Sequence, residues 1–295
     1  MAVWLSFALL GLSICALWLA PLKITRAVSA TPWMILFVMA CACAAAAGVI
    51  TASGLAALAL LGGAAYITGD ARFGRALRIA AGIVTTVLAL ALALHKLPGF
   101  ANPQLVANLR LTADAVPYTQ YANFDKGAVG LLLLAFLCPR AATAAEWRAL
   151  LRRSAPIALF TLAGVMGVAL AIGVVRPAFK WSDYTIVFLA TNLLFTCVAE
   201  EAFFRGLVQG RLAAMRPDSR LWQVAVLALS AILFGLAHLG GGTAYAALAT
   251  LCGVGYAYAF AATRRIEAAI LTHFGFNALH FVAFTYPALA PSVNP

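Results

Sequence analysis

Long apolar runs separated by short polar turns make up most of the chain. A helix needs about 20 mostly apolar residues to cross the hydrocarbon core of a bilayer. Runs of suitable length centre on 3–22, 31–50, 53–69, 79–95, 155–175, 184–206, 222–239, 243–262 and 267–286. A shorter run from Gly127 to Cys138 is either a tilted span or a re-entrant segment. It is the fifth of the ten runs in chain order. The pattern predicts an all-α, polytopic membrane protein of about ten transmembrane helices.

One long polar connection, residues 97–126, interrupts these runs. Its Pro and Asn content predicts a loop. With the weak run that follows it, this loop separates an N-terminal part, 1–150, from a C-terminal part, 151–295. The first apolar run has no basic residue before it, whereas Lys23 and Arg26 follow it. A cleaved signal peptide has the opposite order, so we expect a retained first helix that starts outside.

The composition agrees with a membrane protein. Hydrophobic residues make up 64% of the chain and charged residues 10%, and the mean hydropathy is +0.98. An ordinary soluble domain is roughly 45–50% apolar and about 25% charged. The values exclude a disordered chain, a secreted disulfide scaffold and most soluble enzymes. The six Cys lie in or beside apolar runs without CxxC spacing, which predicts buried thiols rather than a zinc or redox site.

The net charge of +11 comes from 20 Lys and Arg against 9 Asp and Glu. Because the basic residues form short clusters between apolar runs, we expect them to contact the cytoplasmic face of the lipid bilayer and no nucleic acid. Ten spans with both ends outside place 15 of the 20 basic residues inside. The remaining five are Lys96, Arg110, Lys126, Arg176 and Lys180.

The seventh run, TNLLFTCVAEEAFFRGLVQGRL, carries two adjacent carboxylates in apolar surroundings. Charged groups inside a membrane span are costly and indicate a functional site. Glu201 and Arg205 share a helix face at i,i+4 and can pair, whereas Glu200 points about 100° away and has no partner nearby on the helix. The segment also fits an ordinary Glu–Arg pair at a cytoplasmic helix end, and both interpretations remain open on this segment alone.

Two further runs carry histidine. Phe234 and His238 share a face at the end of the eighth run, and His273 and Asn277 share one in the tenth, with His280 a heptad beyond. A single intramembrane histidine is usually a packing residue, but three polar patches on nearby helices favour a common site.

Depth along the helices supports such a site in part. At about 1.5 Å per residue, Glu200 and His238 each lie about 25 Å from the turn between their helices. His273 follows Arg265 closely and is expected to lie shallower.

These residue types suit hydrolysis of a peptide bond. A desolvated glutamate is an effective general base for water, and His and Asn donors stabilise a developing oxyanion. No G-x-S-x-G elbow occurs, and no Ser or Cys is convincingly paired with a base. Activated water is therefore favoured over a nucleophilic side chain.

The segments EEAFFR (200–205), FGLAH (234–238) and HFGFN (273–277) resemble the EExxxR, FxxxH and HxxxN/B motifs of the CAAX-protease and bacteriocin-processing family. The members are also called ABI-type or glutamic intramembrane endopeptidases. Each motif alone is weak, but the three in this order are specific, and the small-residue stretch GVGYAYAFAATRR lies between the last two as in family members. The resemblance covers roughly 155–286.

The resemblance implies a role for each motif residue. Glu200 is the implied catalytic carboxylate that activates water, and His238 assists it. Glu201 and Arg205 would support the site as an orienting pair. No metal ion or other cofactor is implied.

The third motif supplies the implied oxyanion site. His273 and Asn277 would polarise the scissile carbonyl and stabilise the oxyanion. Phe234 is expected to be a packing or substrate-wall residue, and His280 to be structural.

The resemblance also implies a location and a substrate class. Residues 151–295 would form the protease core in the C-terminal helix bundle, and 1–150 an extension of unknown role. We expect a membrane-associated peptide or protein as substrate and a prokaryotic cell membrane as location. Nothing in the sequence indicates a prenylated substrate.

Two alternatives remain. A zinc-dependent protease would use Glu200, His238 and His273 as ligands, although the HExxH arrangement is absent. A non-enzymatic membrane protein would be a bacteriocin-immunity factor, a scaffold or a proton-coupled transporter. The lack of inverted repeats counts against the transporter, whereas inert immunity or scaffolding stays open because family membership does not guarantee activity.

Overall fold

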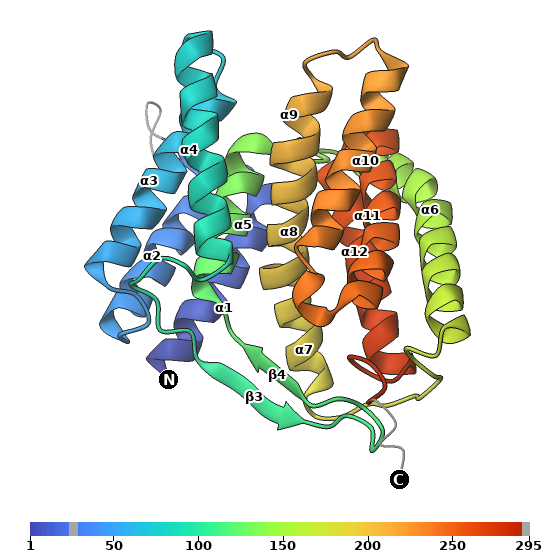
Figure 1. Ribbon diagram of the computed structural model, residues 1–295. Helices are drawn as coiled ribbons and strands as arrows, with labels where there is room; N and C mark the ends of the chain where they lie inside the picture. The colour runs from blue at the N-terminus through green and yellow to red at the C-terminus, as the bar shows by residue number, and fades with distance from the viewer. Residues whose placement is uncertain (24–28, 291–295) are drawn as a thin grey trace. The chain divides into compact units, whose positions relative to one another are not determined.

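The computed structural model describes residues 1–23 and 29–290 (Figure 1). Arg26, which contributes to the predicted orientation, lies outside the described residues. Every predicted apolar run contains helix. The helices outside the seventh run are α1 (Ala2–Cys15), α2 (Pro32–Ala46), α3 (Ala52–Gly69), α4 (Arg75–Ala93), α5 (Phe124–Leu137), α6 (Ala144–Ala171), α10 (Arg220–Leu236), α11 (Thr243–Thr263) and α12 (Ile266–Ala283).

The seventh run forms one long helical stretch, Thr185–Ala213, that is not regular. It consists of α7 (Thr185–Thr191), a π-helical segment (Asn192–Cys197), α8 (Val198–Glu201), a second π-helical segment (Ala202–Gln209) and α9 (Gly210–Ala213). Short 3-10 turns follow α1 at Ala16–Trp18 and α10 at Leu239–Gly241.

Within the described residues, six helical stretches have the length and apolar character needed to cross a membrane. They are Ala52–Gly69, Arg75–Ala93, Ala144–Ala171, Thr185–Ala213, Thr243–Thr263 and Ile266–Ala283. The all-α, polytopic membrane fold is thus confirmed. The number of ten spans stays a prediction, because the other helices are shorter.

The prediction of a loop over 97–126 is wrong in part. This segment contains β3 (Gln104–Leu109) and β4 (Tyr118–Tyr121), which pair antiparallel. Pro103 and Pro117 stand directly before the two strands, so they remove no hydrogen bond from the ladder. A second, very short antiparallel pair joins β1 (Leu22–Lys23) to β2 (Ser29–Ala30).

The chain forms two compact units whose boundaries differ from the predicted division at residue 150. Unit 1 comprises Met1–Pro103, Ala122–Ala142 and Leu194–Leu207. Unit 2 comprises Gln104–Tyr121, Thr143–Leu193 and Val208–Pro295. The stretch around Glu200 therefore packs with the N-terminal helices. The separate functional roles expected for 1–150 and 151–295 stay predictions.

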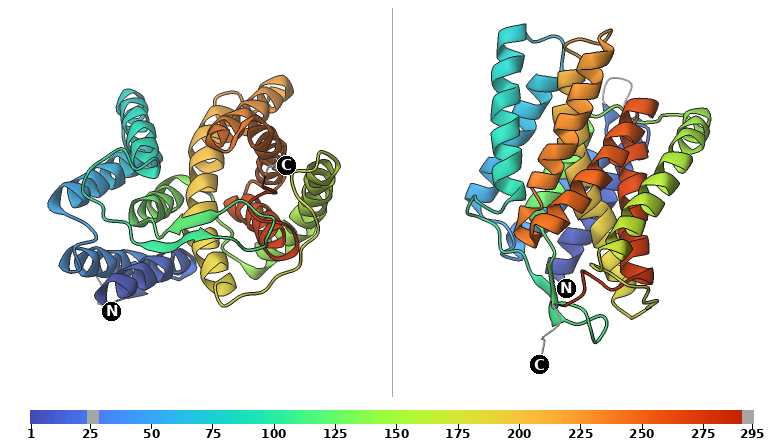
Figure 2. Two further views of the ribbon diagram at one scale, coloured as in Figure 1. Left: turned by 60° about the horizontal axis from the view of Figure 1, so that its bottom comes forward. Right: turned by 45° about the vertical axis from the view of Figure 1, so that its right-hand side comes forward.

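Helix α5 is the centre of unit 1. It contacts α1, α3, α4 and α8 (Figure 2), and Leu131, Leu133 and Leu134 are fully buried. Burial on all sides explains why a 14-residue helix with little amphipathic pattern is stable here. At its start, the ring of Phe124 meets Phe7 of α1 edge-on.

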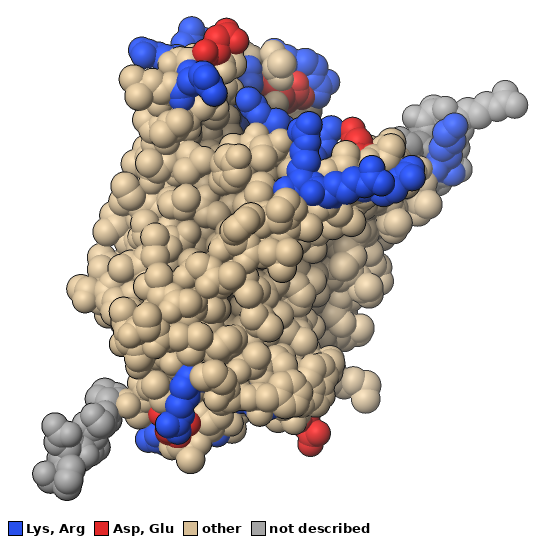
Figure 3. All heavy atoms as spheres, turned by 90° about the vertical axis from the view of Figure 1, so that its right-hand side faces the viewer, with Lys and Arg blue, Asp and Glu red and all other residues tan. Residues whose placement is uncertain are grey.

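Unit 2 is built from α6, α10, α11 and α12, with α11 contacting the other three. Helix α6 begins at Ala144, well before the predicted start at 155, because Thr143 caps it by accepting a hydrogen bond from the backbone N–H of Glu146. Glu146 also pairs with Arg265 at 2.8 Å. Figure 3 shows the face of the molecule on the α6 side, where Lys and Arg gather toward the top and bottom of the view and the band between them shows no charged side chain. This distribution suits a helix bundle that faces lipid.

Candidate active site

Glu200 and Glu201 lie in the four-residue helix α8 between two π-helical segments. Such segments are rare and frequently occur at functional sites. A π-turn contains more residues than an α-turn, so side chains beyond it change face relative to a regular helix. The regular helical period expected from the sequence contains neither π-helical segment.

Glu201 and Arg205 form the pair that their spacing predicts. Arg205 Nη1 lies 3.0 Å from Glu201 Oε1, and both side chains are completely buried. A buried ion pair is costly to break, because the remaining charge then lacks a partner in an apolar interior. The pair therefore holds one face of α8 and the following turn in a defined conformation.

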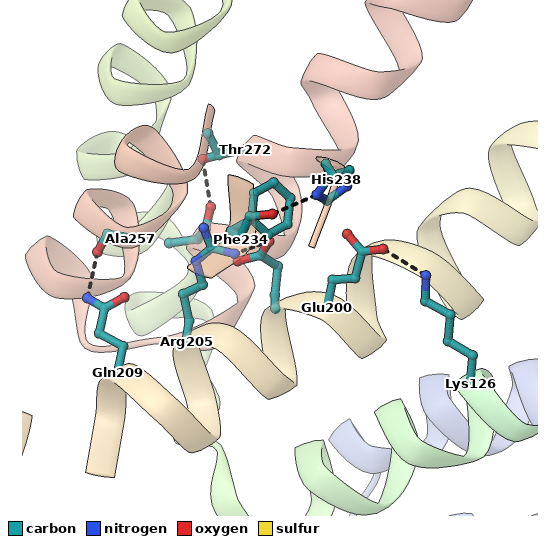
Figure 4. Close-up of polar contacts among 10 residues, drawn as sticks. Lys126, Glu200, Arg205, Gln209, Phe234, His238, Ala257 and Thr272 are labelled. Atoms are coloured by element: carbon teal, nitrogen blue, oxygen red, sulfur yellow. Dashed lines mark hydrogen bonds and ion pairs between the residues drawn. The ribbon is translucent and has the colours of Figure 1, made fainter. Parts of the chain in front are cut away.

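Glu200 pairs with Lys126, which lies in α5, 74 residues away in the sequence. Lys126 Nζ donates to Glu200 Oε1 at 2.7 Å, and Figure 4 draws this contact as a dashed line. The side chains are 18% and 15% exposed, so the contact is largely shielded from water. The charge distribution of the sequence predicted that Lys126 lies on the outer side of the membrane, and no sequence pattern connected it with Glu200. The one sequence signal for this contact is that the cation Lys126 directly precedes the short apolar run 127–138.

In unit 2, His238 lies just beyond the end of α10, where the chain enters a short 3-10 turn. Its Nδ1 is 2.7 Å from the backbone oxygen of Phe234. A carbonyl oxygen only accepts hydrogen bonds, so Nδ1 carries the proton in this contact. In the neutral ring, Nε2 then holds the lone pair and acts as an acceptor.

His273 is held by two aromatic rings of unit 2. The Tyr256 ring stacks on it at 4.5 Å between centroids, and the Phe234 ring meets it edge-on at 5.5 Å. Phe234 also contacts the His238 ring at 4.5 Å. Both histidines thus share one phenylalanine, although the distance of His273 from the preceding turn predicts a shallower position. Tyr256 was not predicted as a site residue from the sequence; it lies in the small-residue stretch between the last two motifs.

Asn277 shares a face of α12 with His273, as predicted from the i,i+4 spacing. Its Nδ2 donates to Oδ1 of Asn192 at 3.2 Å. Asn192, a carboxamide within an apolar run, begins the first π-helical segment. It was missed because no local pattern connects two residues 85 positions apart.

Other predicted groups lie apart from these contacts. His280 donates from Nε2 to the Thr285 carbonyl oxygen at 3.2 Å. None of the six cysteines is in a disulfide; Cys138, Cys197 and Cys252 are buried as predicted, whereas Cys15 is exposed. Over 1–23 and 29–290, no group of three or more His, Cys, Asp and Glu side chains is arranged to hold a metal ion.

The predicted residues thus form local groups within each unit. Unit 1 joins Glu200 to Lys126 and Glu201 to Arg205. In unit 2, the rings of His238 and His273 both contact Phe234, and Asn277 is hydrogen-bonded to Asn192. The first group offers a carboxylate, and the second offers an imidazole acceptor and nitrogen donors.

Residues 181–279 match the model of a family described as Rce1-like, type II CAAX prenyl endopeptidase. The match confirms the family assigned from the three motifs: the chain carries a domain of the CAAX-protease family. It supports a CAAX-protease-type endopeptidase in an integral membrane protein. No curated protein and no solved structure matches the chain.

Proposed function

We propose that the protein is an intramembrane endopeptidase that hydrolyses peptide bonds of membrane-associated peptides or proteins with water activated by Glu200. One observation carries this proposal: the family match over 181–279 includes all the residues that the chemistry needs. They are Glu200, His238, His273 and Asn277.

In the proposed reaction, the Glu200 carboxylate takes a proton from water while the water oxygen attacks the scissile carbonyl carbon. His238 assists by accepting a hydrogen bond from this water at Nε2, a role supported by the Nδ1 contact with the Phe234 carbonyl. The tetrahedral intermediate then breaks at the C–N bond. The proton held by Glu200 passes to the leaving amine, and the carboxylate is restored.

Negative charge develops on the carbonyl oxygen during this attack. We assign its stabilisation to N–H donors of His273 and Asn277. Their proposed role is supported by the contacts that orient them, because a preorganised donor costs little reorganisation during the reaction. Glu201 and Arg205 act as an orienting pair and touch no reacting atom.

The proposal includes a location and requires no cofactor. We place the protein in a prokaryotic cell membrane, with lipid and the substrate as its partners and no nucleic acid. The family description names a CAAX prenyl endopeptidase, so a farnesylated CAAX peptide is the first substrate to test beside its unprenylated form.

The test uses the full chain in liposomes with both fluorogenic peptides. Glu200→Gln is expected to lower the cleavage rate by about 10²- to 10⁴-fold, the usual contribution of general-base catalysis. Glu146→Gln is the matched control, because Glu146 pairs with Arg265 at a helix end, and it is expected to keep activity. Full cleavage by Glu200→Gln would overturn the proposal.

Two further measurements distinguish this proposal from a zinc-dependent protease and from a non-enzymatic membrane protein. Loss of cleavage with a chelator and its recovery with zinc would replace the glutamate mechanism by a zinc mechanism. Cellular membrane-protein C-termini are compared between wild type and Glu200→Ala, and uncleaved C-termini that accumulate in the variant identify the substrate. Identical C-termini, with biological function retained, would favour an immunity factor or scaffold.

A further inference from the structure

Lys126 lies outside the family-matched segment, yet its ammonium group contacts Glu200. The contact is short, at 2.7 Å, and both side chains are mostly buried. An ion pair of this kind contributes more than an exposed one, because water screens it little.

Close helix packing brings Lys126 to Glu200. A Cβ atom added to Gly130 of α5 would lie 2.9 Å from Cα of Ala199, the neighbour of Glu200 in α8. A Cβ at Gly127 would lie 2.7 Å from the Phe195 ring. Small residues on one face of α5 therefore let the backbones approach. Lys126, one turn before Gly130, then reaches Glu200 without spanning a wide gap.

A polar network fixes the start of α5 and the residue beside Lys126. Asp125 Oδ2 lies 2.7 Å from His95 Nδ1, and its Oδ1 accepts from Asn102 Nδ2 at 3.0 Å. The same Oδ1 accepts from the backbone N–H of Lys126 at 2.8 Å. Asp125 is 1% exposed. The backbone that carries the ammonium group is therefore held in place by hydrogen bonds to a buried carboxylate.

An ionised carboxylate in apolar surroundings is costly unless it is paired, and an unpaired one becomes protonated instead. A protonated glutamate accepts no proton from water. A cation beside Glu200 thus maintains the ionised form that a general base needs, and it restricts the rotation of the carboxylate. Among the other charged groups of unit 1, Glu201 and Arg205 bind each other, and Asp125 binds His95.

We propose that Lys126 is a positioning residue of the protease site: it holds Glu200 ionised and oriented for attack on water. The part of the chain before the family-matched segment then contributes a residue that supports catalysis. This inference rests on the proposed role of Glu200 as general base. Lys126 itself touches no reacting atom.

The first test compares Lys126→Met and Lys126→Arg in liposomes with the farnesylated CAAX peptide. Lys126→Met keeps length and apolar bulk, and we expect kcat to fall by about 10- to 100-fold with KM little changed. Lys126→Arg keeps the charge and is expected to recover most of kcat. Lys96→Met is the matched control, because Lys96 is exposed in the same unit. Unchanged kcat in Lys126→Met, or equal loss in Lys126→Arg, would overturn the inference.

The second test does not depend on activity. Dicyclohexylcarbodiimide modifies protonated carboxyl groups in apolar surroundings, and mass spectrometry measures the labelled fraction of Glu200. We expect labelling to rise several-fold in Lys126→Met and to remain at the wild-type level in Lys126→Arg and Lys96→Met. Equal labelling in all four proteins would overturn the inference. If no protein cleaves peptide but labelling rises in Lys126→Met, the proposed function fails while the ion-pair role of Lys126 stands.

Discussion

The ring of Tyr256 lies almost parallel to the imidazole of His273, with centroids 4.5 Å apart and planes inclined by 15°. Both side chains are buried, and they come from neighbouring helices, α11 and α12. Stacking of this kind limits rotation of the imidazole about its bonds. Tyr256 thereby sets the direction in which His273 can donate a hydrogen bond.

Removing the Tyr256 ring is therefore expected to lower peptide cleavage. Tyr256→Ala should reduce kcat by about tenfold, because His273, the oxyanion donor in the proposed reaction, would then be misplaced and lose part of its stabilising effect. Tyr256→Phe keeps the ring and should retain more of the activity. Steady-state kinetics of the three proteins in liposomes checks this, and equal rates for Tyr256→Ala and wild type would contradict it.

The buried pair of Glu201 and Arg205 is expected to matter for stability. Arg205→Met leaves a buried carboxylate without its cation and should lower the free energy of unfolding by about 3–5 kcal/mol. The double variant Glu201→Gln/Arg205→Met should recover part of this loss. Denaturant unfolding in detergent measures both.

The control for this prediction is the pair of Asp70 and Arg72 on the turn between α3 and α4, in which the Arg72 side chain is 76% exposed. Arg72→Met should change stability far less than Arg205→Met, because solvent screens the charge of the exposed guanidinium. A similar loss in Arg72→Met and Arg205→Met would mean that burial is not the cause.

Gly130 is predicted to be intolerant of a side chain. Gly130→Ala places Cβ against the α8 backbone, so α5 and α8 must separate and the contact of Lys126 with Glu200 must lengthen. We expect a lower Tm and reduced kcat. In Gly164→Ala the added Cβ meets nothing within 4 Å, and the loss of a helical glycine should keep or raise Tm. Thermal unfolding measures Tm for both variants, and an unchanged Tm in Gly130→Ala would contradict the prediction.

The contribution of Lys180 to the free energy of unfolding is expected to depend on pH. It lies outside the helices, and burial lowers its pKa from the usual 10.5 to about 8, opposed by the nearby charge of Asp114. Between about pH 8 and 10.5 the unfolded chain binds more protons at this site than the folded chain, so the contribution of Lys180 to stability rises with pH. Below pH 8 both states are protonated and the contribution is constant.

The variant Lys180→Met removes this contribution. The unfolding free energy of wild type minus that of Lys180→Met should therefore increase from pH 8 to 10.5 and stay level from pH 6 to 7.5. Denaturant unfolding of both proteins at each pH provides the measurement. A difference that is flat over the whole range would show that the pKa is not lowered in the folded protein.

Local sequence patterns were sufficient for much of the fold. Apolar runs of membrane-spanning length predicted the helices, because the bilayer requires backbone hydrogen bonds to be satisfied within each segment. The i,i+4 spacing predicted the pair of Glu201 and Arg205, and the shared face of His273 and Asn277. Pro and Asn over 97–126 did not predict β3 and β4, because strand pairing depends on residues of the other strand.

Taken alone, the sequence determined the membrane class, the three motifs and the contacts within one helical turn, since each depends on composition or on helix period. Only the tertiary structure decided that Lys126 faces Glu200, that Asn192 holds Asn277 and that Tyr256 stacks on His273. The first two contacts join residues 74 and 85 positions apart. They arise where small residues and π-helical segments set the approach and rotation of whole helices, and no short-range pattern in the sequence records that geometry.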